Sequence, residues 1–378
     1  MTFSKIWRRR WGRPQHEIIT VVVGSGIVPL VVEDGSGAPA EWEGKRWVRP
    51  AGLSDGFAPE SQPVTIALIN NMPDAALEDT ELQFFELLNN AAGNIPVSVK
   101  LYSLPGIPRS ARGEQHLNSL YSGIDDLVNG RFDGVIITGT EPLQSDLRAE
   151  PYWEVLTSVF DWAERNSTST VLSCLAAHAG VLYSDGIPRH RLADKQFGVF
   201  DFKKNLGHAL TQHIEEAVQT PHSRWNEVRE DALLACGYDV LTSSMQGGVN
   251  SFVKKKGNCL FVHFQGHPEY GAQTLLKEYR RDIKRFLRRE RETYPAMPVG
   301  YFNVSVSHLL AEFQNNVLSD AREEQMSSFP EGAVVDTLRN SWAPWATDLY
   351  RNWLQYLISR KSDNSSSVAA SRSVPSLH

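Results

Sequence analysis

One cysteine, Cys174, lies at a junction where a thiol could act as a nucleophile. It follows residues 169–173 (Ser-Thr-Val-Leu-Ser), which are typical of a β-strand, and precedes residues 175–180 (Leu-Ala-Ala-His-Ala-Gly), which are typical of a helix start. A thiol held at a sharp turn from strand to helix projects above the sheet edge, where the helix N-terminus favours a thiolate and backbone N–H groups can hold an oxyanion. The small side chain of Ala176 lets such a turn close without a clash. We therefore predict that Cys174 is a nucleophile.

A candidate base and its partner follow a second predicted strand, residues 258–264. His267 and Glu269 lie in the segment Gly-His-Pro-Glu-Tyr, just after this strand. Parallel strands bring their carboxyl ends to one edge of a sheet, so we expect both side chains beside Cys174. A nucleophile, a base and a carboxylate that orients the base are the parts of a Cys-His-Glu acyl-transfer site.

Other histidines and cysteines compete for these roles. His263 lies within the predicted strand, and we expect it to be packed in the core. His178 lies one helical turn after Cys174, so it could line the site without being the base. Cys236 and Cys259 have no comparable context, and we expect both to be structural.

The elements that must position these residues alternate along the chain. Hydrophobic periodicity predicts strands at 64–69, 97–102, 134–138, 170–173 and 258–264, and helices at 79–91, 116–128, 153–165 and 274–291. The part between residues 198 and 257 is richer in strands, with short candidates at 238–241 and 250–253. Strands that alternate with helices predict an α/β fold, a mostly parallel sheet with helices on both faces.

Composition excludes several classes of protein. The chain has 378 residues, 41% hydrophobic and 22% charged, which suits a globular protein with a sizeable core. A net charge of −6 argues against a nucleic-acid partner, which needs a basic face. Three cysteines without metal-ligand spacing predict neither a disulfide framework nor a metal site, and they favour the cytoplasm. The arginines of 274–291 are balanced by acidic neighbours, so we expect a solvated face rather than an anion site.

The N-terminus superficially resembles an export signal, because basic residues precede an apolar run at 18–32. The run is interrupted by Gly24, Gly26 and Pro29, and no small-residue cleavage site follows it. We expect two short strands there, and no membrane attachment.

Taken in order, a series of short motifs resembles the homoserine O-acyltransferase family of the succinyltransferase type, whose fold is that of class I glutamine amidotransferases. The likeness runs from about residue 64 to residue 357. Its motifs are Asn71-Met72-Pro73, Thr80-Glu81, Gln115-His116-Leu117-Asn118, Phe132-Asp133-Gly134, Thr138-Gly139, Tyr152-Trp153, Cys174, Tyr183, Gly186-Ile187-Pro188, Lys195, Gly198-Val199, Pro221-His222-Ser223-Arg224, Gly266-His267-Pro268-Glu269-Tyr270, Ala272-Gln273-Thr274-Leu275, Arg281-Asp282 and Asn352-Trp353-Leu354.

The resemblance implies a ping-pong reaction in methionine or related sulfur amino-acid biosynthesis. Acyl-CoA, as co-substrate and without a bound cofactor, acylates Cys174; His267 is the proton acceptor and Glu269 its partner. The homoserine hydroxyl, or that of a close analogue, then attacks the thioester. Lys195, Ser223 and Arg281 fall where the family contacts the amino-acid acceptor. The resemblance therefore implies three catalytic residues, Cys174, His267 and Glu269, and three substrate-binding residues, Lys195, Ser223 and Arg281. The partners expected are small molecules, with a homodimer as one option.

Composition predicts an N-terminal extension at 1–60, which is basic and rich in Gly and Pro, and a disordered Ser-rich tail at 361–378; the acyltransferase domain that the resemblance implies lies between them, at 61–360. The chain departs from the family where lysines usually follow the Met-Pro pair, since Asp74, Ala75 and Ala76 stand there. The residues at 141–144 do not distinguish succinyl from acetyl transfer. A glutamine amidotransferase or hydrolase on the same fold, and a non-catalytic relative, remain the alternatives.

Overall fold

The computed structural model describes the backbone of residues 5–10, 17–22, 30–33, 63–205, 207–319 and 322–372, with side chains for those between 63 and 362. Within these ranges the strands form one sheet in the order β1-β2-β3-β5-β4-β6-β7-β12-β11-β10-β8-β9. The centre of the sheet is parallel and consists of β3 (Leu30–Glu33), β5 (Val97–Tyr102), β4 (Val64–Ile69), β6 (Phe132–Ile137), β7 (Ser167–Ser173) and β12 (Cys259–Phe264).

Antiparallel strands flank this centre on both sides. One flank consists of β1 (Lys5–Arg10) and β2 (Glu17–Val22); the other consists of β11 (Gly248–Lys256), β10 (Asp239–Ser244), β8 (His190–Lys204) and β9 (Ala217–Glu227). The predicted α/β class is confirmed, with the qualification that the sheet is parallel at its centre and antiparallel at its flanks. The two short strands predicted within 18–32 correspond to β2 and β3, which pair antiparallel.

Helices cover both faces of the parallel strands, because successive side chains of a strand point to opposite faces. In β4, Ile66 and Leu68 join one core with α1 (Asp74–Ala92) and α10 (Ala343–Arg372). Ala67 and Ile69 join a second core with α4 (Trp153–Asn166) and α5 (Leu175–Asp185). Such two-sided burial suits the largely apolar strands β4 and β12, whereas β5 (Val-Ser-Val-Lys-Leu-Tyr) and β7 (Ser-Thr-Ser-Thr-Val-Leu-Ser) also contain polar residues.

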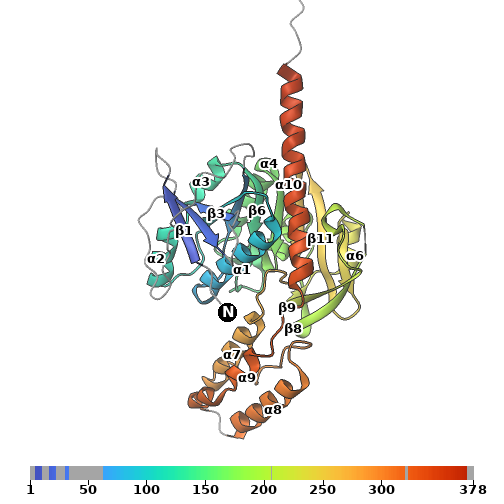
Figure 1. Cartoon of the computed structure of the whole chain (residues 1–378). Helices are drawn as coiled ribbons and strands as arrows, with labels where there is room; N and C mark the ends of the chain where they lie inside the picture. Colours follow the sequence, from blue (N-terminus) through green and yellow to red (C-terminus); the bar gives the residue numbers. More distant parts are fainter. Residues whose placement is uncertain are drawn as a thin grey trace, which may run out of the picture.

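The remaining helices connect or extend this frame. They are α2 (Ala111–Leu120), α3 (Ile124–Asn129), α6 (Glu230–Ala235), α7 (Thr274–Leu287), α8 (Val304–Ser319) and α9 (Glu331–Val335), with short 3₁₀ turns at Leu147–Ala149, Ala209–Thr211 and Glu323–Ser328. Helices α7, α8 and α9 lie together beyond one end of the sheet, whereas α10 runs along the sheet and projects past its other end (Figure 1). No helix among the described residues is long and apolar enough to cross a bilayer.

Most of the predicted elements match the structure, but one predicted helix is in fact two. The segment 116–128 is divided between α2 and α3 because the Ser122 N–H donates to the Leu101 carbonyl oxygen of β5 at 2.8 Å. Helix α7 ends at Leu287 rather than at residue 291, and Arg289 just beyond it has a positive φ of 62°. A backbone conformation of that kind is incompatible with a continuing helix.

The C-terminal segment contains more helix than we expected. Helix α10 continues through Arg372, so it includes residues 361–372 of the predicted tail, and residues 373–378 lie outside the described part. The division into extension, domain and tail stays a prediction. Trp353 anchors α10 on the sheet: its Nε1 donates to Ser169 Oγ at 2.9 Å, and its ring occupies the space that a Cβ on Gly134 would need.

Candidate active site

The turn between β7 and α5 holds Cys174 in a strained conformation. Its φ of 52° and ψ of −109° lie outside the regions that residues with a Cβ normally occupy. The Cys174 N–H donates to the Phe264 carbonyl oxygen of β12 at 2.7 Å, and the Cys174 carbonyl accepts from the Ala177 N–H at 3.0 Å. The predicted turn is therefore present, and its thiol is partly exposed at the start of a helix.

His267 reaches the same edge because the chain after β12 can turn tightly. The Gln265 N–H donates to the Asn250 carbonyl oxygen at 2.8 Å, and the His267 N–H donates to the Pro221 carbonyl oxygen at 2.9 Å. Gly266 lies between these two contacts, and an added Cβ there would be 2.6 Å from both Asn250 Oδ1 and His222 Nε2. The glycine is therefore required by close packing rather than by a special backbone angle.

Glu269 holds the imidazole of His267 from the side away from the thiol. Its Oε1 lies 2.9 Å from His267 Nδ1 and accepts a second hydrogen bond from Ser173 Oγ at 3.1 Å. Both side chains are buried. Ser173 immediately precedes Cys174, so one carboxylate is bonded to both segments of the site.

Electrostatics favour a protonated His267. Burial lowers its pKa, but the charge of the Cys174 thiolate and then that of Glu269 raise it, as do hydrogen bonds to both groups, so that the pKa lies well above its usual range. An imidazole that keeps its proton beside a thiolate is the resting state expected of a Cys-His nucleophile. The structure brings Cys174, His267 and Glu269 together.

The three predicted acceptor residues also lie together, around two carboxylates of α7. Lys195 Nζ lies 3.6 Å from Glu278 Oε2 and 3.4 Å from Asp282 Oδ2. Arg281 reaches the same pair, with its Nε 3.1 Å from Asp282 Oδ1. Ser223 Oγ donates a very short hydrogen bond to Glu278. Three segments far apart in the sequence therefore meet at Glu278.

Tyr270 connects the two groups of residues, and sequence analysis did not assign it a role. Its ring stacks on the His267 imidazole, with centroids 4.1 Å apart and planes at 17°. Its hydroxyl donates to Glu278 Oε1 at 2.7 Å. Glu278 was missed as well, although it lies one helical turn before Arg281 and so shares a face of α7 with it.

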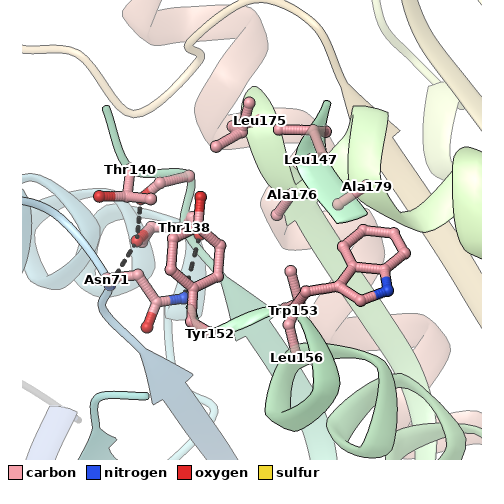
Figure 2. Close-up of a pocket in the computed structure, with 11 residues that line it drawn as sticks. Asn71, Thr138, Thr140, Leu147, Tyr152, Trp153, Leu156, Leu175, Ala176 and Ala179 are labelled. Carbon is pink, nitrogen blue, oxygen red and sulfur yellow. Dashed lines mark hydrogen bonds between the residues drawn. The ribbon is translucent and has the colours of Figure 1, made fainter. Parts of the chain in front are cut away.

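A small pocket opens beside Leu175, the residue that follows Cys174 (Figure 2). Its walls come from the ends of β4 and β6 and from the starts of α4 and α5; the lining residues are Asn71, Thr138, Gly139, Thr140, Leu147, Tyr152, Trp153, Leu156, Leu175, Ala176 and Ala179. Asn71 and Thr138 are joined by a hydrogen bond from the Asn71 N–H to Thr138 Oγ1 at 2.8 Å. The pocket is predominantly apolar and aromatic.

The segment where lysines were expected is used for structure. Asp74 opens α1, and its carboxylate accepts from the Ser110 N–H at 2.7 Å and pairs with Arg109 at 3.3 Å. Burial raises the pKa of Asp74, but its hydrogen bonds with Ser110 and Arg109 and the charge of Arg109 lower it on balance. Asp74 therefore joins α1 to the start of α2.

The competing histidines have other partners. His178 Nε2 contacts Gln265 Oε1 at 2.9 Å, and burial lowers its pKa to about 3, so it stays neutral. His263 stacks on Phe252 with centroids 4.6 Å apart, and burial likewise lowers its pKa to about 3. The structure supports the packed position that we predicted for His263.

Cys259 and the arginines at the end of the arginine-rich helix have surroundings of the kind predicted. Cys259 is fully buried, and burial raises its pKa. Arginines in and just after α7 are paired with acidic residues, among them Arg285 with Glu141 and Arg288 with Glu323. The described residues contain no cluster of histidine, cysteine and acidic side chains that could hold a metal ion.

Comparison with known proteins gives consistent matches over most of the chain. A family model described as homoserine O-succinyltransferase matches residues 54–364. A homoserine O-succinyltransferase from Rhodopseudomonas palustris is 42% identical over 296 residues, covering 78% of this chain and 89% of that protein. One from Bradyrhizobium japonicum is 42% identical over 309 residues, covering 82% of this chain and 94% of that protein.

Among solved structures, a glutamine amidotransferase from Thermotoga maritima is similar with a TM-score of 0.44 and 11% sequence identity, covering 79% of this chain and 99% of that one. A glutamine amido transferase from Methylobacillus flagellatus has a TM-score of 0.40 and 12% identity, covering 78% and 94%. Likeness at this level does not support a functional argument, and the fold class rests on the strand order and the helical layers described above.

Proposed function

The chain belongs to the homoserine O-succinyltransferase family, and from this premise we propose that it transfers a succinyl group from succinyl-CoA to the hydroxyl of L-homoserine through a thioester on Cys174. The observation that carries the proposal is the hydrogen-bonded Cys174, His267 and Glu269 array at the edge of a sheet, next to a cluster suited to an amino acid. The product would serve methionine or related sulfur amino-acid biosynthesis.

In the first half-reaction the Cys174 thiolate attacks the thioester carbonyl of the acyl-CoA. A new carbon–sulfur bond forms to Cys174, and the bond to the CoA sulfur breaks. The proton of the His267 imidazolium passes to the departing CoA thiolate. The raised pKa of His267, caused largely by the thiolate, keeps this proton available until the attack.

In the second half-reaction the acceptor hydroxyl attacks the thioester while His267 takes its proton. Acylation removes the thiolate charge, which is the largest contribution that raises the pKa of His267. We therefore expect that pKa to fall in the acyl-enzyme, which leaves a neutral imidazole ready to act as the base. Cys174 departs as the thiolate and recovers its imidazolium partner. Glu269 orients the ring in both steps.

Backbone N–H groups supply the oxyanion site in this proposal, since Asp74, Ala75 and Ala76 replace the lysines of the family. The Leu175 N–H opens α5, and the first N–H groups of a helix have no acceptor within the helix. Gly139 lies against it: an added Cβ would be 2.9 Å from the Leu175 nitrogen. The absence of a side chain at Gly139 leaves room for an oxygen atom there.

We predict that Gly139→Ala lowers kcat about 10²-fold, because the methyl group displaces the Leu175 amide from the developing oxyanion. Steady-state release of CoA measures this effect. Gly123→Ala is the matched control, since nothing lies within 4 Å of a Cβ added at Gly123, and it should behave as the unmodified protein. Equal losses in both variants would rule out the proposed role for this amide.

The acceptor cluster suits both charges of an amino acid. Arg281 can hold the α-carboxylate with two parallel hydrogen bonds, and Lys195 pairs with the other carboxylate oxygen of Asp282. Glu278 can accept from the α-ammonium group. Ser223 holds Glu278 in place through its hydroxyl.

A variant with lysine at position 281 tests whether the acceptor site needs the guanidinium group of Arg281 or only its positive charge. We predict that Arg281→Lys raises KM for homoserine about tenfold, because a lysine cannot make the paired contact with a carboxylate. Arg288→Lys is the control just after the same helix; Arg288 pairs with Glu323, and its substitution should leave KM unchanged. Substrate titrations of both variants test the prediction, and an unchanged KM in Arg281→Lys would contradict it.

The overall proposal is tested by incubating the purified protein with succinyl-CoA, with and without L-homoserine. We expect release of CoA and an O-succinyl product with homoserine, and a protein that is heavier by one succinyl group on the Cys174 peptide without it. Acetyl-CoA in a parallel reaction measures the selectivity for the donor. Glutamine hydrolysis without acyl transfer would instead favour an amidotransferase-type activity.

A further inference from the structure

A single side chain, Tyr270, touches both halves of the proposed site. One face of its ring covers the His267 imidazole, with centroids 4.1 Å apart, and its hydroxyl donates to Glu278 Oε1 at 2.7 Å. Its own backbone is held on both sides: its N–H donates to the His267 carbonyl oxygen at 3.2 Å, and its carbonyl accepts from Trp342 Nε1 at 2.6 Å. The tyrosine is buried, and its position is set by four separate contacts.

The hydroxyl of Tyr270 is suited to hold a carboxylate. Burial, and then the charge of Glu278, raise the pKa of Tyr270 well above its usual range. The phenol therefore stays protonated and donates a hydrogen bond to Glu278. The other oxygen of Glu278 faces Ser223, Lys195 and Arg281. Both oxygens of this carboxylate are therefore oriented before any acceptor arrives.

A tyrosine ring is rigid, so it holds its two contacts at a constant separation. Tyr270 thus keeps Glu278, which would bind the acceptor ammonium, at a set distance from His267, which would take the acceptor hydroxyl proton. Homoserine carries its hydroxyl one methylene farther from the ammonium than serine does. A fixed separation between Glu278 and His267 favours one of these lengths over the other.

We propose that Tyr270 is a positioning residue that sets the distance between Glu278 and His267 and thereby selects an acceptor by the spacing of its ammonium and hydroxyl groups. The inference rests on the proposed function, because it assigns the acceptor to this cluster. It concerns the second half-reaction, since acyl-CoA carries no ammonium group that must reach Glu278.

The test separates the hydroxyl of Tyr270 from its ring. Tyr270→Phe keeps the stacked ring and loses the hydrogen bond to Glu278. We expect kcat/KM for homoserine to fall about tenfold or more while kcat/KM for serine changes little, so that discrimination between the two acceptors decreases. The rate of acylation by succinyl-CoA alone, measured as the burst of CoA in a single turnover, should change about twofold at most.

Tyr270→Leu removes the ring as well, and it reports on the contact with His267 independently of transferase activity. We expect alkylation of Cys174 by iodoacetamide at a fixed pH to slow severalfold in Tyr270→Leu and to keep its rate in Tyr270→Phe, because only the former frees the imidazole. Tyr279→Phe is the control: Tyr279 is a buried tyrosine of α7 whose ring packs against Tyr294 and Phe302.

The outcomes distinguish this inference from the proposed function. If the unmodified protein acylates Cys174 and Tyr270→Phe keeps its preference for homoserine, the inference is wrong and the proposed function stands. If Tyr270→Phe slows acylation as much as transfer to homoserine, the residue has a general structural role. If the unmodified protein transfers no acyl group and Tyr270→Leu is alkylated at the unmodified rate, both proposals are overturned.

Discussion

Replacing Cys174 by alanine should abolish the transfer, lowering kcat/KM by about 10⁴-fold or more. The proposed route has one nucleophile, and without its sulfur atom neither the thioester nor the release of CoA can occur. Two measurements check this result: the rate of CoA release with succinyl-CoA and homoserine, and the mass of the protein after exposure to succinyl-CoA alone. The variant should show no added succinyl group.

Cys236→Ala provides the matched control for this experiment. Cys236 packs against an apolar cluster with members from the end of α5 and from α6, β10 and β11, which is separate from the two larger cores on the faces of the sheet. The Cys236→Ala variant should acquire a succinyl group as the unmodified protein does. A Cys174→Ala protein that still transferred succinate at the unmodified rate would eliminate the thioester mechanism, whatever the identity of the acceptor.

His267→Asn should be the second most damaging change, with kcat/KM lower by about 10³-fold to 10⁴-fold. The asparagine retains the approximate size of the ring near Glu269 but cannot carry a proton between the two half-reactions. Stopped-flow measurements of acylation and of the subsequent transfer should show that both are slow. A loss confined to one step would contradict the double role given to this imidazole.

The pH dependence of stability provides an independent check on His267. Because its pKa is raised in the folded protein, the residue contributes stability that is fully present below its unfolded pKa of about 6.5 and is lost as the pH rises through the folded value. The difference in unfolding free energy between the unmodified protein and His267→Asn should therefore shrink with rising pH. Denaturant titrations over that range measure it.

His178→Gln separates the proposed base from its nearest competitor. His178 lies within one helical turn of Cys174, but burial lowers its pKa to about 3, so its imidazole stays neutral and is a weak proton acceptor at neutral pH. Glutamine can preserve a contact with Gln265. The variant should keep kcat/KM within a few-fold of the unmodified protein, and a loss as large as that of His267→Asn would exchange the two roles.

Local patterns predicted the strands of the parallel centre well. Strands β4 and β5 have the predicted bounds, 64–69 and 97–102, because both segments are rich in residues that favour strands and their apolar side chains pack in the cores. The long pair β8 and β9 was recognised only as a strand-rich region. Its residues are exposed in part, so their hydrophobic pattern is weak, and their pairing depends on the opposite strand rather than on their own sequence.

The site was predictable where chemistry and chain position coincide. Cys174 is preceded by an apolar strand and followed by a helix start, and His267 and Glu269 follow another strand, so each lies at an element boundary that the sequence reveals. No local pattern predicted that Glu278 and Tyr270 lie in the same site as Cys174, His267 and Glu269. Glu278 is one of several charged residues on a strongly charged helix, and nothing in its immediate sequence distinguishes it from a solvated carboxylate.

The sequence by itself therefore determined the fold class, the placement of Cys174, His267 and Glu269 at the ends of neighbouring strands, and through its motifs the family to which the chain belongs. Only the tertiary structure decided that Lys195, Ser223 and Arg281 converge on Glu278, and that Tyr270 joins this cluster to His267. The physical reason is the sequence separation over which each kind of interaction acts. Periodicity and turn chemistry act over a few neighbouring residues, whereas a cluster assembled from β8, β9 and α7 exists only after the sheet has paired and its helices have packed.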